Sequence, residues 1–411
     1  MIKTHVILIV ALCCIGCSEN PNPDFRENRV PLSEGDWRFT MNLNGKLLPF
    51  NARLQDTDSK PLLTIKNGEE SISVENTFLR NDSLIASLPV FNTEIQLRVE
   101  SSDMVSGHFI DYNRENYRIP LNGEYGNNFR FTSSKSNIDI AQRYRVIFTE
   151  KDQTTYPAVL TLSNDSGRVE GTFMTETGDY RYLDGNLMNG GIYLSTFDGS
   201  HAFYFQADIE GDSLTNGIFY SGTHYSAEWH GKADANASLS DPESLTTIEN
   251  HNSFNFKLPN QNGDTVTYET MDLKGKIVII EIMGTWCPNC LDAARSLASI
   301  VKDYDDVVVV PVLFEYQDDI EFARKAYEKF SSKIRFSNKT FLFGGKANKE
   351  VALSKFPMLS GFSSFPTIIF LDQTGKVVRI YTGFYGPATG NYYQDFVSGT
   401  RALIDSLNRN F

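Results

Sequence analysis

Cysteine is scarce in this chain beyond its first seventeen residues, and that scarcity limits what the remaining cysteines can do. Of the five cysteines in 411 residues, only Cys287 and Cys290 lie beyond Cys17. A disulfide framework needs several pairs spread through the fold, and a bridge this short would remove little entropy from the unfolded chain. The pair is therefore interpreted as reactive rather than structural.

The sequence also lacks an excess of basic residues and a group of residues spaced to bind a metal. The 38 Lys and Arg residues stand against 51 Asp and Glu, and the net charge of -13 argues against a nucleic-acid partner. His201, His224, His230 and His251 are scattered, without cysteines or carboxylates at a spacing typical of zinc. With one cysteine pair only, we expect no metal and no cofactor.

Long apolar runs are confined to the start of the chain. A basic start followed by the apolar residues 6–15 is typical of a secretory signal peptide. The run is shorter than the roughly 20 residues of a spanning helix. The signal is expected at 1–17, with a polar tether at 18–34.

The end of this segment, Gly-Cys-Ser at 16–18, resembles the lipobox of bacterial lipoproteins, although Cys14 stands where that motif usually has leucine. The resemblance implies lipidation of Cys17 and a lipid anchor in a bacterial cell envelope, facing the periplasm or the cell surface. Ordinary cleavage and an uncleaved anchor are the alternatives.

Residues 35–240 are expected to be all-β. Short alternating or aromatic-rich runs such as 37–41 and 144–148 are separated by turn signals such as Asn-Gly at 44–45. Closely spaced antiparallel strands are typical of a barrel or sandwich. We expect a module for binding or spacing here, because no catalytic constellation is present.

This β half contains an internal sequence repeat. Residues 106–112 resemble 216–221 at an offset of about 110 residues, which indicates two copies of one β-meander. The copies are placed at 35–131 and 141–240, followed by a polar linker at 241–253.

Alternating strands and helices are expected from residue 254 to 411. Residues 277–283 form an apolar run typical of a strand buried on both faces. Pro288 then suits the first turn of a helix, because a first-turn N–H has no helical partner. A strand at 307–313, a helix at 320–331, a hairpin at 367–381 and a helix at 392–407 complete the expected order.

This order, with Trp-Cys-Pro-Asn-Cys at 286–290 after the first central strand, resembles the thioredoxin fold. Leu-Lys-Gly-Lys at 273–276 and Phe-Pro-Thr at 365–367 make it more similar to the TlpA/ResA-type thiol-disulfide oxidoreductases. The resemblance covers about 254 to 410 only. It implies an enzyme acting on protein disulfides in the envelope, as a reductase kept reduced by a membrane or periplasmic electron donor.

Cys287 is the expected nucleophile. At a helix N-terminus, free N–H groups and the helix dipole stabilise a thiolate. Cys290 would resolve the mixed disulfide, leaving a redox-active Cys287–Cys290 disulfide. Neither Pro288 nor Asn289 adds positive charge, and Trp286 is expected to shield the pair.

Glu281, six residues before Cys287, is a candidate proton shuttle. A desolvated carboxyl has a raised pKa and can take the proton of Cys290; a glutamate that reaches solvent is the alternative. ResA-type proteins tend to carry an acid three residues after the second cysteine. Ala293 stands there in this chain, which leaves the role to Glu281 or to water.

The resemblance further implies a cis peptide bond before Pro366, the alternative being a trans proline at a strand start. Phe365 would offer its backbone to a bound substrate strand. Pro288 and Thr367 are further candidate substrate contacts.

Two other functions stay open. In one, the β half captures a ligand or partner and the protein is an envelope binding or scaffold lipoprotein with a secondary dithiol. The other is a peroxiredoxin-like thiol peroxidase. It would need Thr-X-X-Cys and a nearby arginine, whereas Thr285 stands only two residues before Cys287.

Overall fold

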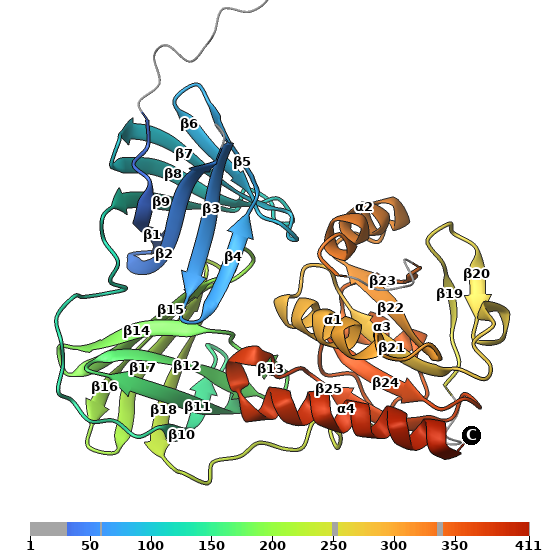
Figure 1. Cartoon of the computed structure of the whole chain (residues 1–411). Coiled ribbons are helices and arrows are strands. Elements are labelled where there is room, and N and C mark those ends of the chain that lie inside the picture. The colour runs from blue at the N-terminus through green and yellow to red at the C-terminus, as the bar shows by residue number, and fades with distance from the viewer. Residues whose placement is uncertain (1–30, 58–59, 249–253, 335–339, 411) are drawn as a thin grey trace, which may run out of the picture.

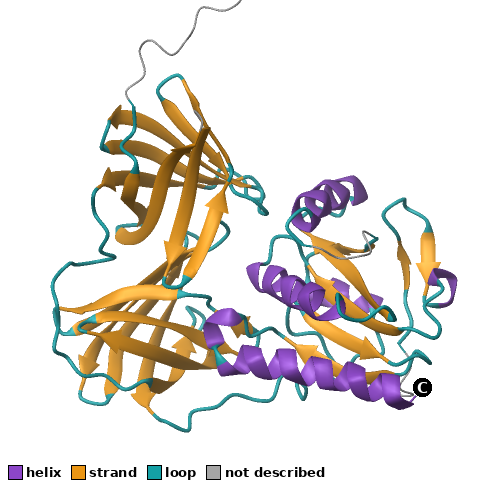
Figure 2. Ribbon diagram, in the orientation of Figure 1, coloured by secondary structure: helices purple, strands orange, loops and turns teal. Residues whose placement is uncertain are grey.

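The computed structural model describes residues 31–410 except 58–59, 249–253 and 335–339. The expected signal peptide, Cys17 and most of the tether lie outside the described residues. Figures 1 and 2 show two β bodies followed by a body of mixed helices and strands. The expected multidomain fold, all-β before α/β, is confirmed. Of the helices in the described ranges, none has both the length and the apolar character needed to cross a bilayer.

The first β body is a nine-stranded antiparallel sheet with the order β4-β3-β2-β1-β9-β8-β7-β6-β5. Inward residues alternate with exposed ones along its strands, so that Phe39, Phe50 and Phe109 are each 2% exposed or less. The strands are β1 (Gly35–Leu43), β2 (Lys46–Thr57), β3 (Lys60–Asn67), β4 (Glu70–Val74), β5 (Asn76–Arg80), β6 (Ser83–Ser87), β7 (Thr93–Ser101), β8 (Met104–Asp111) and β9 (Arg118–Tyr125).

The second β body is also nine-stranded, with the order β11-β10-β18-β17-β16-β15-β14-β12-β13, and an additional β11–β12 pairing closes it on itself. Its core is aromatic, with Phe205 stacked on Phe219 at a ring-centroid distance of 4.4 Å. The strands are β10 (Arg143–Thr149), β11 (Thr155–Asp165), β12 (Arg168–Thr175), β13 (Gly178–Asp179), β14 (Leu183–Met188), β15 (Gly191–Phe197), β16 (Ala202–Glu210), β17 (Ser213–Ser221) and β18 (Tyr225–Ala233).

The two β bodies share one strand order. β1 lies between β2 and β9, and β10 lies between β11 and β18, after which the remaining strands follow in the same sequence. The echoed glycines occupy equivalent strands, Gly107 in β8 and Gly217 in β17. A Cβ on either would lie 2.0 or 2.3 Å from a backbone oxygen of a neighbouring strand, which explains why both copies have glycine there. The shared order supports a duplicated meander.

The third body contains a five-stranded sheet with the order β23-β22-β21-β24-β25, in which β21, β22 and β23 are parallel, β24 is antiparallel to β21, and β25 is antiparallel to β24. Every residue of β21 is buried, as the apolar run predicted. Its strands are β21 (Ile277–Met283), β22 (Val307–Glu315), β23 (Leu342–Lys346), β24 (Thr367–Leu371) and β25 (Val377–Thr382), and a hairpin of β19 (Lys257–Pro259) and β20 (Thr265–Thr267) precedes them.

Helices cover both faces of this sheet. Ile277 and Ile279 pack with residues of α1 and α4, while Val278 and Ile280 pack with Ala352 of α3 on the other side. The helices are α1 (Pro288–Val301), α2 (Ile320–Ser331), α3 (Lys349–Lys355) and α4 (Asn391–Asn410), with short 3-10 turns η1 (Glu269–Met271) and η2 (Pro387–Thr389). Both β23 and α3 were absent from the sequence-based expectation.

Candidate redox site

The Cys-X-X-Cys motif lies where β21 meets α1. Cys287 is the N-cap residue of α1, in an extended conformation, and Pro288 occupies the first turn of the helix. The motif therefore stands beyond the carboxyl end of a fully buried central strand, which fixes its position. Cys287 is 7% exposed and Cys290 is fully buried; both are free thiols.

The Cys287 sulfur has two polar neighbours. The backbone N–H of Cys290 donates to it over 3.2 Å, as expected for a thiolate site at a helix N-terminus. The thiol also donates to the carbonyl of Phe365 over 3.6 Å. Burial raises the pKa of Cys290 well above its ordinary value, and the neighbouring Cys287 raises it further. The two cysteines thus differ in burial: Cys287 keeps a slight exposure, whereas Cys290 has none.

Glu281 is fully buried on β21, which excludes the solvent-exposed alternative. Neither of its carboxylate oxygens has a hydrogen-bond partner among the described residues. Burial raises the pKa of Glu281 well above its ordinary range, and the charge on Cys287 raises it further. In its ionised form, a carboxyl with a raised pKa is a stronger base than an ordinary carboxylate and can take a proton from a neighbouring thiol.

Trp286 is fixed beside the dithiol by its indole N–H, which donates to the carbonyl of Phe314 over 2.9 Å. Its ring meets that of Phe365 edge-on at a centroid distance of 5.8 Å. Glu315 accepts from the Thr285 backbone N–H and hydroxyl at 2.9 and 3.0 Å, and burial raises the pKa of its carboxyl to about 7. The Thr285 hydroxyl is therefore directed at Glu315.

The Phe365–Pro366 bond is cis, the isomer that the resemblance implies. This loop brings the Phe365 carbonyl to the Cys287 sulfur. Thr367 is fully buried, its hydroxyl donates to the carbonyl of Ser364 over 2.8 Å, and it is paired with Ile282 and Thr382 of the neighbouring strands. Pro288 is buried as well.

Sequence reasoning missed a set of residues on the second β body that touch the motif. Arg181 donates to the carbonyl of Pro288 over 3.3 Å, and the side-chain amide of Asn289 donates to the carbonyl of Asp179 over 3.1 Å. The hydroxyl of Ser200 donates to the carbonyl of Trp286 over 3.2 Å. No sequence motif marks these positions, because their role arises only from the packing of the bodies.

A metal centre has no basis in the described residues. Among them, no group of three or more His, Cys, Asp or Glu side chains is arranged to hold an ion. The groups at this site that can react are the two thiols and the carboxyl of Glu281.

The model of the AhpC/TSA family matches residues 250–404. This match covers the third body and confirms that the C-terminal part of the chain is thioredoxin-like. None of the curated proteins matches the chain.

Several solved structures are similar to part of the chain. A DsbF homologue from Corynebacterium diphtheriae has 16% identity and a TM-score of 0.30, covering 41% of this chain and 98% of its own. A putative thiol:disulfide interchange protein DsbE from Chlorobium tepidum has 19% identity and a TM-score of 0.28, covering 37% and 98%. The thioredoxin domain of a thiol-disulfide oxidoreductase from Bacteroides vulgatus has 20% identity and a TM-score of 0.26, covering 39% and 99%.

Proposed function

We propose that the third body is a thiol-disulfide oxidoreductase that reduces disulfides with the Cys287–Cys290 pair. The observation that carries this proposal is the placement of one slightly exposed cysteine at a helix N-terminus, with a second, fully buried thiol within the same helical turn. The backbone N–H of Cys290 supports a thiolate on Cys287, the form that attacks a disulfide.

The reaction proceeds in two exchanges. The Cys287 thiolate attacks one sulfur of the substrate disulfide, a mixed disulfide forms, and the other substrate sulfur leaves as a thiolate. Cys290 then loses its proton and attacks the Cys287 sulfur, which releases the second substrate thiolate. Two electrons pass from the dithiol to the substrate, and the enzyme is left as the Cys287–Cys290 disulfide.

Glu281 is the proposed acceptor of the Cys290 proton. The thiol is fully buried, so bulk water does not reach it directly, whereas Glu281 lies close enough to influence its pKa. Because burial raises the pKa values of both groups, the ionised form of Glu281 takes the proton from Cys290 at a smaller cost than an ordinary carboxylate would.

The physiological setting completes the proposal. The resemblance to TlpA/ResA-type proteins and the lipobox-like segment at 16–18 favour a lipid-anchored enzyme of the bacterial envelope. Reduction of a protein disulfide there requires a dithiol donor at the membrane or in the periplasm to reduce Cys287–Cys290 again.

Peroxidase activity is the second candidate, because the AhpC/TSA match is also compatible with it. A peroxidase would draw on a hydroxyl near the reactive sulfur, but the Thr285 hydroxyl donates to Glu315 instead. The dithiol function is therefore preferred over peroxide reduction, and over a purely binding role for the chain.

The test uses the reduced full chain with Cys13, Cys14 and Cys17 replaced by alanine, so that Cys287 and Cys290 are the only thiols that can react. When this chain reacts with 5,5′-dithiobis(2-nitrobenzoate), we expect it to release two coloured 2-nitro-5-thiobenzoate ions from the reagent per chain. Cys290→Ser should release one and remain as a mixed disulfide.

Rates with hydrogen peroxide are measured on the same chain. Slow exchange with the disulfide and fast consumption of peroxide would favour the peroxidase. Failure to react with either reagent would contradict both redox functions.

A further inference from the structure

The surface around the dithiol is covered by the rest of the same chain. Three backbone carbonyls belong to residues around Cys287: its chain neighbours Trp286 and Pro288, and Phe365, whose carbonyl contacts the sulfur. Ser200 donates to the first and Arg181 to the second, both from the second β body. The third accepts from the Cys287 thiol over 3.6 Å.

The loop that carries the cis proline is held in the same way. The Ser364 hydroxyl donates to the carbonyl of Thr177 over 2.8 Å. Gly178 follows at a φ of 137°, and a Cβ there would lie only 2.2 Å from the side-chain nitrogen of Asn289. The segment before β13 therefore lies directly on both loops of the dithiol.

The first β body adds an apolar contact. Val90 and Phe91, in the loop between β6 and β7, belong to the same buried cluster as Cys287 and Cys290. Phe91 is only 6% exposed, and its carbonyl accepts from the ammonium of Lys329 on α2. This loop is thus packed on the third body beside the thiols.

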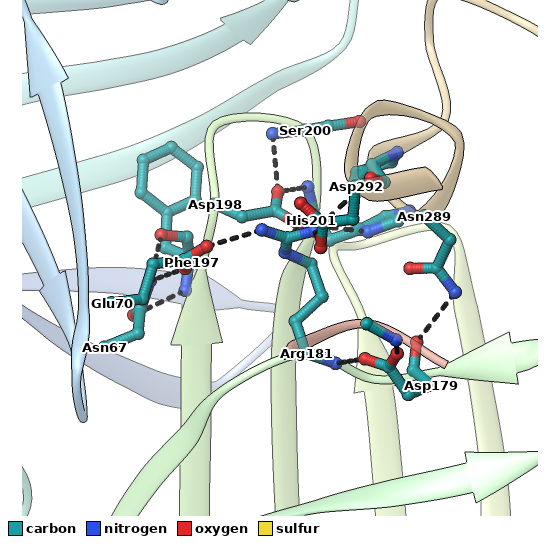
Figure 3. A network of polar contacts seen from close by, with 12 residues as sticks. Asn67, Glu70, Asp179, Arg181, Phe197, Asp198, Ser200, His201, Asn289 and Asp292 are labelled. Atoms are coloured by element: carbon teal, nitrogen blue, oxygen red, sulfur yellow. Dashed lines mark hydrogen bonds and ion pairs between the residues drawn. The ribbon is translucent and has the colours of Figure 1, made fainter. Parts of the chain in front are cut away.

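Arg181 joins all three bodies, as Figure 3 shows. Its guanidinium pairs with Glu70 of the first body and with Asp292 of α1, and it lies 3.2 Å from the carboxylate of Asp198 in its own body. Only 4% of the Arg181 side chain is exposed. One buried cation surrounded by carboxylates from three bodies holds them together only while every partner stays in place.

We infer that the two β bodies act as a built-in cap over the dithiol, held by Arg181, which excludes folded protein substrates until it opens. The inference rests on the proposed function and assigns the β bodies a part in substrate selection. A protein substrate needs the carbonyls and loops around Cys287, which the cap occupies, whereas a small disulfide needs only the sulfur.

The contact between the two β bodies and the third body is of a kind that can open. The contact includes hydrogen bonds and ion pairs as well as apolar packing, and a cavity of about 420 Å³ lies between the three bodies, lined by Glu70, Phe91, Arg181, Asp198 and Arg295 among others. Polar interfaces between domains of one chain permit relative motion, unlike a continuous apolar core.

The experiment compares large and small reagents on the reduced full chain without its three N-terminal cysteines. Large reagents are insulin and a polyethylene-glycol maleimide of several kilodaltons; small ones are 5,5′-dithiobis(2-nitrobenzoate) and N-ethylmaleimide. Arg181→Met and Phe91→Ala each remove a separate part of the cap. Arg145→Met is the matched control, because Arg145 pairs with Asp234 on the exposed surface of the second body, with 54% of its side chain accessible.

The expected result is a rise of about tenfold or more in the ratio of large-reagent to small-reagent rates for Arg181→Met and Phe91→Ala. Arg145→Met should leave this ratio as in the parent chain. Far-ultraviolet circular dichroism checks that each variant is folded. Because the two cap variants lie on different β bodies, the test remains possible if one of them fails to fold.

Two results would contradict the inference. One is an unchanged ratio in both folded cap variants. The other is a parent chain in which Cys287 reacts as fast with the large maleimide as with the small one. Failure of the proposed function looks different. In that case no variant exchanges with either disulfide, while the two maleimides still report whether Cys287 is covered.

Discussion

The side-chain amide of Asn289, inside the Cys-X-X-Cys motif, donates to the backbone carbonyl of Asp179 in β13 over 3.1 Å. A residue between the two reactive cysteines is thereby bonded to a different body of the chain. Asp179 is itself held, because its carboxylate accepts from the backbone N–H groups of Arg181 and Gly386. The geometry of the dithiol loop and the position of the second β body are therefore coupled.

Gly178→Ala tests this coupling. The new Cβ would lie 2.2 Å from the side-chain nitrogen of Asn289, so either this amide turns away and loses its bond to Asp179 or the second body shifts from the motif. We expect alkylation of Cys287 by a large maleimide to accelerate severalfold. Gly190→Ala is the control: its positive φ of 75° also strains an alanine, but no atom lies within 4 Å of the added Cβ. Equal acceleration in both variants would assign the effect to strain alone.

Glu281→Gln removes the proposed proton acceptor without changing the shape of the side chain. We expect the first exchange at Cys287 to proceed at its normal rate and the attack by Cys290 to slow by about 10²-fold or more. Rapid-mixing measurement of the two thiolate release phases across pH separates the steps. A second phase with the parent rate and pH profile would remove Glu281 from the mechanism.

Glu315→Gln should change how stability depends on pH. Burial raises the pKa of Glu315 from 4.5 to about 7 despite two hydrogen bonds from Thr285, so the folded protein favours the neutral form. This contribution is complete below about pH 4.5 and is lost as the pH rises through 7, a difference of roughly 3 kcal/mol.

The glutamine stays neutral, so the free energy of unfolding should fall less between pH 5 and 7 than in the parent chain. Urea unfolding at several pH values measures this slope. The exposed Glu228→Gln serves as the control. A variant that retains the parent slope would place the titration elsewhere.

The central strand and its motif could be predicted because they are locally encoded. Seven consecutive apolar or buried positions at Ile277–Met283 and a cysteine pair just beyond them leave little choice of structure. The β half could be assigned to its class for the same reason, since turn residues and alternation are local signals. By contrast, β23 and α3 are short and follow a segment with no strong period, so the sequence did not reveal them.

The contacts of Arg181 could not be predicted from sequence. Glu70 and Asp292 each lie more than a hundred residues from it, and the pairing exists only once three bodies have packed together. An arginine near the end of a β-hairpin ordinarily indicates a solvated position. Burial with three carboxylates is a property of the tertiary arrangement and has no local pattern.

Phe205→Ala should destabilise the second β body strongly. The Phe205 ring is fully buried and stacks on Phe219 at 4.4 Å and on Phe173 at 4.6 Å. Its removal leaves a cavity in an aromatic core and should cost about 3–5 kcal/mol of unfolding free energy by urea denaturation. Phe78→Ala, at a site 41% exposed, should cost far less. Similar costs for both would mean that the core relaxes around the cavity.

The reduction potential of the Cys287–Cys290 pair should lie near that of thioredoxin, about -270 mV, or lower. A pair is strongly oxidising when its reduced form is stabilised, as in DsbA at about -120 mV. Here burial and the neighbouring sulfur raise the pKa of Cys290, which disfavours a second thiolate, and the Pro-Asn insert adds no positive charge. Equilibration with glutathione or dithiothreitol buffers gives the value. The Asn289→Lys variant should be more oxidising, because a cation beside Cys287 favours its thiolate. A parent value near -120 mV would reverse the proposed direction and make the protein an oxidant.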